Sequence, residues 1–107
     1  MRADLVRGHL DGLLLSALAG EPAHGYALIE RLAARSGGEL ALPEGTVYPA
    51  LHRLERSGLI ASEWSTASGR RRRVYRLTAR GRRAAQDARS EWQSFARAVG
   101  GVMEVTA

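Results

Sequence analysis

Four consecutive arginines, Arg70–Arg73, are the residues of this sequence whose chemistry is easiest to interpret. A guanidinium group is planar and permanently charged, and its N–H fork matches phosphate oxygens and the edge of guanine. Adjacent cations also repel one another, and a polyanion relieves that repulsion. A solvated turn that binds nothing is the alternative. The run therefore predicts a surface that binds polyanions.

A second candidate surface precedes the arginines, within residues 45–60. Four apolar residues recur at the spacing i, i+3, i+4 and i+7 of one buried helical stripe, namely Val47, Ala50, Leu51 and Leu54. The residues expected on the outer face and its flanks are Pro49, His52, Arg56, Tyr48 and Arg53. Gly58 can supply the positive φ that ends a helix. Any amphipathic helix has such a stripe, so the functional prediction depends on the basic outer face.

Arg53, Tyr48 and His52 each have two interpretations. Arg53 is the best candidate to read a base, because its bidentate fork matches guanine, although a solvated arginine fits the residue equally well. Tyr48 either donates its hydroxyl to a phosphate or packs its ring under Pro49. His52 is expected to contact a phosphate or water rather than a metal, because the three histidines lack ligand-like spacing.

The elements that must position these residues include a hairpin. Two runs rich in β-forming residues, 60–65 and 72–77, flank a turn that contains Ser68 and Gly69. The arginines lie on or beside the tip of this turn. A helix followed by a hairpin with a basic tip is the plan of a winged helix, whose helix enters the major groove while the wing reaches neighbouring backbone or the minor groove.

Two more helices are expected upstream. Apolar residues from Leu5 to Leu18 form a helical stripe that residues 20–22 terminate, and a second helix begins near His24 and ends at 36–38. The second helix and the helix that follows residues 39–42 would form a helix-turn-helix. The predicted fold class is therefore mainly α with a small β-hairpin wing.

A long last helix is predicted from the N-cap Thr78 to about Val99, where Gly100 and Gly101 would stop it. Its apolar residues step by 3, 4, 3 and 4, the heptad period of a seam between helices, and are Ala85, Ala88, Trp92, Phe95 and Val99. The stripe either packs on its own domain or joins two copies, and we favour a homodimer. The expected divisions are a winged-helix domain over 1–77, a dimerisation helix over 78–101 and a tail over 102–107.

Composition agrees with a small binding protein. The 107 residues contain sixteen basic residues, all arginine, against eleven acidic ones, with a net charge of +5 and a pI near 10.9. This balance favours polyanions, although arginine alone also fits a GC-rich genome, and charge alone would suit RNA or an anionic membrane. The absence of cysteine excludes disulfides and thiolate metal sites.

Other function classes find little support in the sequence. It has no cysteine nucleophile, no glycine-rich phosphate loop and no metal-ligand pair at useful spacing, so we predict no enzyme, no catalytic residues, no metal and no cofactor. Charged residues interrupt any signal peptide, and no segment approaches the ~20 apolar residues that span a bilayer. A cytoplasmic protein is the expectation.

Several ordered blocks together resemble the PadR family of bacterial transcriptional regulators. They are Gly45-Thr46-Val47-Tyr48-Pro49, Arg53-Leu54-Glu55, Gly58-Leu59-Ile60, residues 73–78, residues 13–18 and His24-Gly25-Tyr26. The resemblance covers roughly residues 5 to 99. The sequence departs from the family at Leu42, where a small polar residue is usual. That change removes a side-chain N-cap worth ~1 kcal/mol and leaves Pro43 and Glu44 to begin the helix.

The resemblance implies specific roles. The DNA-binding residues would be Tyr26, Thr46, Tyr48, Pro49, His52, Arg53, Arg70, Arg71, Arg72 and Arg73. The residues at the dimer interface or its ligand site would be Leu10, Leu14, Ala85, Ala88, Trp92, Phe95 and Val99. Some family members bind flat aromatic compounds between the protomers, so a planar hydrophobic effector that relieves repression is the hypothesis here. Core packing of Trp92 is the simpler alternative.

A dimer suits the geometry of duplex DNA, because two recognition helices ~34–36 Å apart read the half-sites of an inverted repeat. The competing interpretation is a winged helix that contacts only protein or RNA. Salt separates DNA binding from protein binding, because binding through Z phosphates makes log K fall with a slope of about −0.9Z against log salt, whereas a protein interface responds weakly. A preference for duplex DNA over RNA separates the remaining case.

Overall fold

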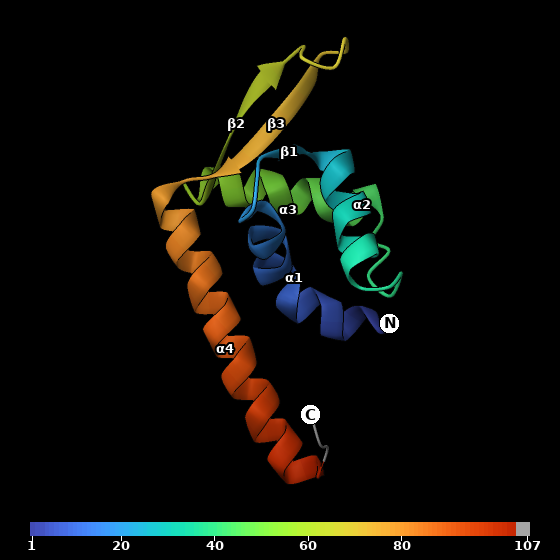
Figure 1. Ribbon diagram of the computed structural model, residues 1–107, viewed down its shortest axis with the longest axis vertical. Helices are drawn as coiled ribbons and strands as arrows, with labels where there is room; N and C mark the ends of the chain where they lie inside the picture. Colours follow the sequence, from blue (N-terminus) through green and yellow to red (C-terminus); the bar gives the residue numbers. More distant parts are fainter. Residues whose placement is uncertain (105–107) are drawn as a thin grey trace.

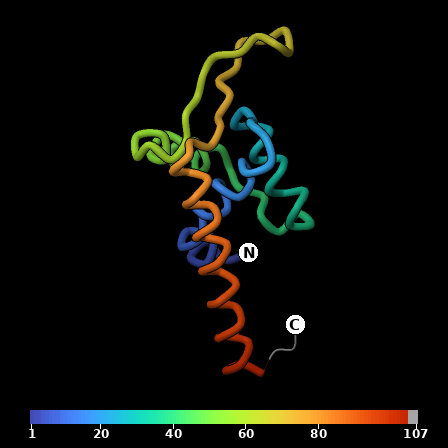
Figure 2. The backbone as a smooth tube through the Cα atoms, turned by 60° about the vertical axis from the view of Figure 1, so that its left-hand side comes forward, coloured from blue at the N-terminus to red at the C-terminus, as the bar shows by residue number. Residues whose placement is uncertain are grey.

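The computed structural model describes residues 1–104 as four helices and a small sheet. The elements are α1 (Ala3–Leu18), β1 (Ala23–His24), α2 (Gly25–Arg35), α3 (Glu44–Arg56), β2 (Ile60–Ser65), β3 (Arg72–Leu77) and α4 (Ala79–Met103). Helices α1 to α3 gather in the middle, while the hairpin and α4 extend in opposite directions (Figures 1 and 2). The longest dimension is 51 Å. The mainly α fold with a hairpin wing is confirmed.

The core lies where α1, α2 and α3 meet the base of the sheet. The predicted stripe of α3 is fully inside it, because Val47, Ala50, Leu51 and Leu54 are each at most 3% exposed. Leu28 and Leu32 bring α2 onto the same core, and Ile29 lies at its edge. Truncating such a leucine to alanine typically costs about 2–5 kcal/mol. The position of the outer face of α3 is therefore fixed by its buried face.

The sheet has the order β1-β3-β2, with both pairings antiparallel. Strand β1 was not predicted, because two residues are too short to show an alternating pattern; Ala23 and His24 pair with Tyr75 and Val74. The hairpin register runs from Ile60 opposite Leu77 to Ser65 opposite Arg72.

Alternation gives the hairpin two different faces. Ile60, Ser62 and Trp64 point to one face of β2, opposite Leu77, Tyr75 and Arg73 of β3. The base of this face is core, since Ile60, Tyr75 and Leu77 are buried. Arg72 and Val74 point to the other face. The inner face, defined here as the face that contains Ile60, Ser62 and Trp64, therefore continues from the core out along the wing.

The first turn of α4 is bonded to the segment that follows α3. The hydroxyl of Thr78 accepts from the Gly81 N–H at 3.1 Å, as predicted for an N-cap, and donates to the Gly58 carbonyl at 2.7 Å. A methyl group at Gly81 would overlap the backbone carbonyl of Leu59. Only glycine permits this approach, so the exit of α3, with Gly58 at φ +78°, and the start of α4 form one rigid joint.

The far end of α4 corrects a prediction. The helix passes through Gly100 and Gly101 and ends at Met103, with Glu104 at φ 57° as its left-handed cap. A glycine ends a helix by adopting positive φ, and neither of these two does so. The predicted tail over 102–107 is therefore wrong for Val102 and Met103, which are helical, while 105–107 lie outside the described residues.

The predicted interface stripe is also corrected at its start. Leu10, Leu14 and Ala85 are buried inside the protomer, at 8%, 0% and 6% exposed, so they offer no surface to a partner. The cause is the packing of α1 on α4, in which a methyl group at Gly12 would come within 3.1 Å of the Ala88 Cβ. The alternative of packing on its own domain is thus right for the first turns of α4.

Candidate nucleic-acid interface

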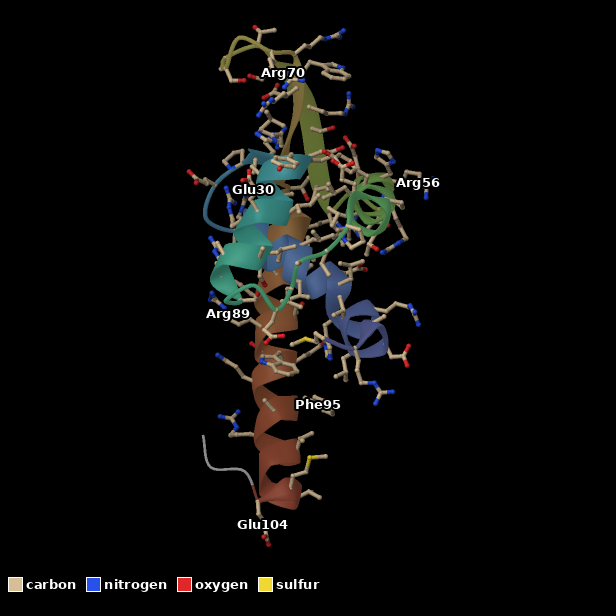
Figure 3. The ribbon with its side chains drawn as sticks, turned by 90° about the vertical axis from the view of Figure 1, so that its right-hand side faces the viewer. Glu30, Arg56, Arg70, Arg89, Phe95 and Glu104 are labelled. Atoms are coloured by element: carbon tan, nitrogen blue, oxygen red, sulfur yellow. The ribbon has the colours of Figure 1, made fainter. Side chains whose placement is uncertain are left out.

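The exposed face of α3 is the first part of the site. Pro49, His52 and Arg56 are all exposed, opposite the buried stripe. Figure 3 shows Arg56 directed away from the body of the molecule. Pro49 lies inside the helix and has no N–H, so the carbonyl of Gly45 lacks its usual helical donor. This face therefore offers both cations and a backbone acceptor to a ligand.

Arg53 has an internal partner that the sequence did not reveal. Its two terminal nitrogens donate to both oxygens of Asp11 in α1, at 2.9 and 2.8 Å. This pairing raises the pKa of Arg53. Both side chains remain about half exposed, at 50% and 48%, and exposed ion pairs contribute only ~0–1 kcal/mol. The fork predicted to read guanine thus connects α3 to α1, and Asp11 must yield before it contacts a base.

Tyr26 and Tyr48 lie where α2 meets α3. The ring of Tyr48 lies over Gly25, the first residue of α2, so closely that a methyl group there would be 2.5 Å from the ring. This contact was not predicted, and it explains why a glycine precedes Tyr26. Tyr26 itself is 53% exposed at the start of α2. Thr46 is partly buried, and its N–H donates to the Pro43 carbonyl at 3.0 Å in the first turn of α3.

The wing arginines do not form one uniform cluster. The guanidinium of Arg71 lies 4.3 Å from the ring centre of Trp64. Arg72 approaches His24 Nε2 at 2.6 Å. Arg73 donates through Nε to the Ser62 hydroxyl at 2.7 Å. Arg70 is exposed near the end of the wing, without a hydrogen bond or ion pair among residues 1–104 (Figure 3).

A carboxylate of the recognition helix anchors the inner face of the wing. Glu55 of α3 accepts from the Ser62 hydroxyl at 2.6 Å and lies 3.9 Å from Arg73. The sequence left open whether Glu55 meets an arginine or solvent, and in the structure it lies near an arginine of the wing. Because Ser62 belongs to the inner face, these contacts direct that face toward α3. Glu55 therefore joins α3 directly to the inner face of the wing.

His24 couples the other face of the wing to α2. Its Nδ1 accepts from the Ala27 N–H at 3.2 Å and caps the helix, while Nε2 faces Arg72. A neutral imidazole has one unprotonated nitrogen, so it accepts from Ala27 or from Arg72 but not from both. Burial lowers the pKa of His24, the Arg72 charge lowers it further, and Glu30 opposes the shift. The Arg72 contact is therefore readily exchanged.

Comparison with known proteins decides what this arrangement is. Residues 14–87, which include the end of α1, helices α2 and α3, the wing and the start of α4, match the Transcriptional regulator PadR-like family. The chain belongs to this family. PadR family members are DNA-binding transcriptional regulators and not enzymes. Family membership thus confirms the predictions of a DNA-binding regulator and of a protein that is not an enzyme.

Individual PadR relatives match over nearly the whole chain. The transcriptional regulator Rv3488 of Mycobacterium tuberculosis is 42% identical over 94 residues, which cover 88% of this chain and 85% of the relative. A PadR family regulator from Eggerthella lenta has a solved structure with a TM-score of 0.80 and 38% identity, covering 96% of this chain and 88% of its own. A PadR family regulator from Clostridium difficile superposes with a TM-score of 0.75 and 35% identity, covering 90% and 98%.

The far half of α4, defined here as residues 92–103, exposes apolar side chains that are unusual on the surface of a monomer. Trp92 and Phe95 are 51% and 56% exposed, with ring centres 6.3 Å apart. His9 of α1 meets the Trp92 ring edge-on at 5.2 Å. Val99 is partly exposed, and Val102 and Met103 are 84% and 69% exposed. Figure 3 shows Phe95 and Arg89 on different sides of the helix, so the helix has an apolar and a basic side.

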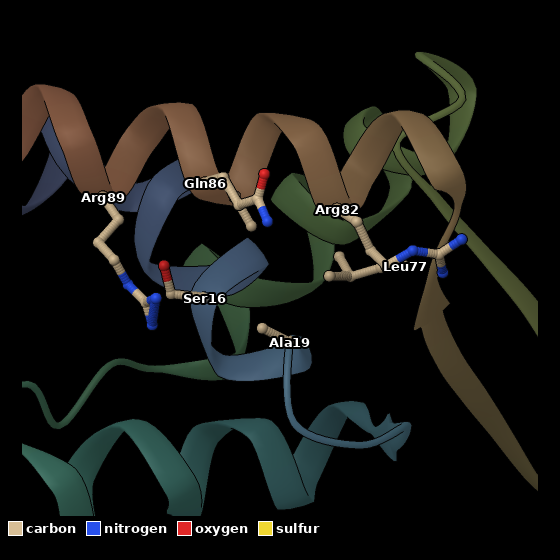
Figure 4. A pocket seen from close by; sticks show the side chains of 7 residues that line it. Ser16, Ala19, Leu77, Arg82, Gln86 and Arg89 are labelled. Atoms are coloured by element: carbon tan, nitrogen blue, oxygen red, sulfur yellow. The ribbon is translucent and has the colours of Figure 1, made fainter.

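A hollow of about 310 Å³ lies between the end of α1, the end of β3 and the first half of α4. Its lining residues are Ser16, Ala19, Leu77, Arg82, Ala85, Gln86 and Arg89. Figure 4 shows Gln86 and Arg89 projecting from α4 on the side of Ser16. The hollow includes neither Trp92 nor Phe95, so it is not the ligand site that the PadR resemblance implies.

Sequence reasoning missed several residues of this interface. Asp11 gave no signal, because 42 residues separate it from Arg53. Trp64 was not considered for DNA, although the hairpin pairing alone places it opposite Arg73.

No helix among residues 1–104 is long and apolar enough to cross a membrane. The same residues contain no group of three histidine, aspartate or glutamate side chains positioned to hold a metal.

Proposed function

We propose that this PadR regulator binds a specific inverted-repeat operator in the cytoplasm as a homodimer, with α3 in the major groove and the wing on the flanking backbone. The observation that carries the proposal is the contact of Glu55 in α3 with Ser62 and Arg73 of the wing, which joins the basic helix α3 to the wing that contains the arginines. The DNA contacts proposed are Tyr26, Thr46, Tyr48, Pro49, His52, Arg53 and Arg70–Arg73. Arg53 takes part only where DNA displaces Asp11.

The second part of the proposal is dimerisation through the far half of α4. Large apolar side chains contribute most to interfaces when a partner removes them from water, and a Trp or Phe buries about 150–250 Å². The exposure of Trp92, Phe95, Val102 and Met103 supports a second copy at this face. In this proposal residues 1–77 bind DNA, and α4 joins the protomers through Ala88, Trp92, Phe95 and Val99 and the turn beyond them.

Repression and its relief form the finest level of the proposal. A planar apolar compound would bind against Trp92 and Phe95 between the protomers, because aromatic faces stack well on flat ligands. Such a compound would act only by favouring one spacing of the two recognition helices over another. The joint between α3 and α4 supports this route, since movement of α4 is passed directly to residues 58–59.

The first test is selection of random duplex DNA by the purified protein at near-physiological salt, followed by sequencing of the bound pool. We expect an enriched inverted repeat whose half-site centres lie about one helical turn apart. A single enriched half-site would contradict the dimer. Uniform, salt-sensitive binding would contradict sequence specificity, and a preference for RNA would favour the alternative winged-helix function.

The effector needs a separate test with the same protein. A library of planar aromatic compounds is titrated while tryptophan emission is followed, and quenching compounds are then added to the protein–operator complex. We expect at least one compound to quench emission and to release the operator. Quenching that persists in Trp92→Phe but not in Trp64→Phe would place the ligand on the wing and contradict the interface site.

A further inference from the structure

Trp64 is a large aromatic side chain on the wing that the core does not use. It is 53% exposed, although it follows the buried Ile60 and the partly buried Ser62 on the same face of β2. The face of an exposed aromatic ring attracts cations through its quadrupole. In this chain two cations cover it, Arg71 at 4.3 Å and Arg73 at 5.3 Å from the ring centre.

The strand register fixes the direction of this stack. Trp64 pairs with Arg73 and shares the inner face with Ser62, which donates to Glu55 of α3. The indole therefore lies on the same side of the wing as the contact with Glu55 of α3, beyond the point where the core ends. Arg72 points to the opposite face and meets His24. The stack thus lies on the side of the wing that a duplex bound to α3 would meet.

The two stacked arginines differ in how many N–H donors they have free. Arg73 is already bonded through Nε to Ser62 and lies near Glu55. Arg71 has no hydrogen bond or ion pair among residues 1–104, so its main contact is the ring face of Trp64. A guanidinium that lies flat on an aromatic ring keeps its in-plane N–H edge available for two phosphate oxygens.

We propose that Trp64 is a positioning residue of the wing, which holds the Arg71 guanidinium over its ring face so that the N–H groups bind a phosphodiester of duplex DNA. The inference rests on the proposed function, since it requires duplex DNA bound to α3 and the wing. Its physical basis is preorganisation: an arginine held by a ring loses less side-chain freedom on binding than a free one. Arg70, which has no such ring, is the natural internal control.

The test measures the affinity of the full-length protein for a labelled mixed-sequence duplex about three helical turns long, across a range of salt concentrations. The variants are Trp64→Ala, Trp64→Phe, Arg71→Ala and Arg70→Ala, with both doubles that combine Trp64→Ala with an arginine change. Thermal unfolding of each variant checks that the fold is intact.

We expect Trp64→Ala to weaken binding about two- to five-fold, in line with an exposed cation–aromatic contact, and Trp64→Phe to recover part of the loss. Adding Arg71→Ala to Trp64→Ala should produce less than the product of the two single effects. Adding Arg70→Ala should simply multiply, because those side chains do not interact. Duplex binding should also change tryptophan emission in the wild type and much less in Trp64→Phe.

Each other outcome overturns the inference. Wild-type affinity in Trp64→Ala would mean that the indole has no role in binding. Multiplicative effects of Trp64→Ala and Arg71→Ala would mean that the indole contacts DNA itself and does not position Arg71. A wild-type protein that binds no duplex in a salt-dependent way would remove the proposed function as well, so the two failures are distinguishable.

Discussion

The proposed DNA-binding surface, formed by α3 and the wing, differs from the far half of α4 in how many of its side chains have a partner within one protomer. On the proposed DNA-binding surface, Arg53, Arg72 and Arg73 each have a polar partner within the chain. In the far half of α4, Trp92 and Phe95 remain about half exposed. The difference agrees with the proposal that one protomer forms the DNA-binding surface and that a second copy covers the apolar side of α4.

The internal partners also offset the repulsion among the cations of this basic surface. Unpaired neighbouring cations would repel one another, and the partners Asp11, His24 and Glu55 come from three different elements. These contacts are partly exposed, so phosphates can replace them at small cost. No polar group can cover the far half of α4 in the same way, because the exposure of its apolar side chains to water is unfavourable.

The largest effect should come from separating the two regions at their joint. Replacing Gly81 by alanine places a methyl group against the Leu59 carbonyl, and neither backbone can move without breaking the Thr78 contacts. We expect a loss of about 3 kcal/mol in the free energy of unfolding, measured by urea titration.

The same change on the far half of α4 is the matched control. A methyl group at Gly101 meets nothing within 4 Å, so Gly101→Ala should leave stability unchanged or raise it by up to ~1 kcal/mol. Equal losses at the two glycines would show that the joint is not the rigid point of the molecule.

The next effect concerns the partner that the far half of α4 lacks. Trp92→Ala should weaken dimerisation by about 2 kcal/mol or more, which raises the dimer Kd roughly 30-fold, while the unfolding of the monomer changes little. Sedimentation equilibrium measures this constant, with Arg97→Ala on the same helix as the control. If dimer dissociation is the same in Trp92→Ala as in the wild type, Trp92 does not belong to the interface.

The same contrast governs what could be predicted from the sequence. The recognition helix was predictable because its apolar spacing and Gly58 are local signals, and Val47, Ala50, Leu51 and Leu54 are indeed buried. The division of α4 was not, because a heptad stripe does not reveal whether it faces its own domain or another copy. Ala85 and Trp92 belong to the same heptad pattern, but Ala85 is buried in its own protomer and Trp92 is about half exposed.

The pairing of the arginines was equally hidden from the sequence. Four adjacent arginines look equivalent in a row of letters, but strand alternation sends Arg72 and Arg73 to opposite faces. Asp11 reaches Arg53 only because α1 packs across α3, and tertiary contacts of this kind leave no periodic trace. A family resemblance assigned the DNA-binding role to these positions without the internal partners that this chain gives them.

A smaller effect would show whether Arg53 belongs to DNA or to α1. Arg53→Ala should cost ~1–3 kcal/mol on the selected operator and relax selectivity at one base pair, measured by competition binding. Asp11→Asn should lower stability by about 1 kcal/mol or less and leave operator selectivity in place, since the fork is then free. Identical losses of selectivity in both variants would instead mean that the ion pair only sets the position of α3.

The smallest effect is a pH dependence at the contact between the wing and α2. The folded-state pKa of His24 is below its ordinary value of 6.5, so the unfolded chain takes up the proton first on acidification. The His24 contribution to stability is therefore complete above that value and is lost as the pH falls from it through the lower folded-state pKa, because burial and the Arg72 charge disfavour the protonated ring. The melting temperature should fall between about pH 7.5 and about pH 5.5.

His24→Asn keeps a capping acceptor that does not titrate, so its fall should be smaller, whereas the exposed His52→Gln should behave as the wild type. If His24→Asn shows the full wild-type fall, acid sensitivity arises elsewhere and His24 does not join the wing to α2.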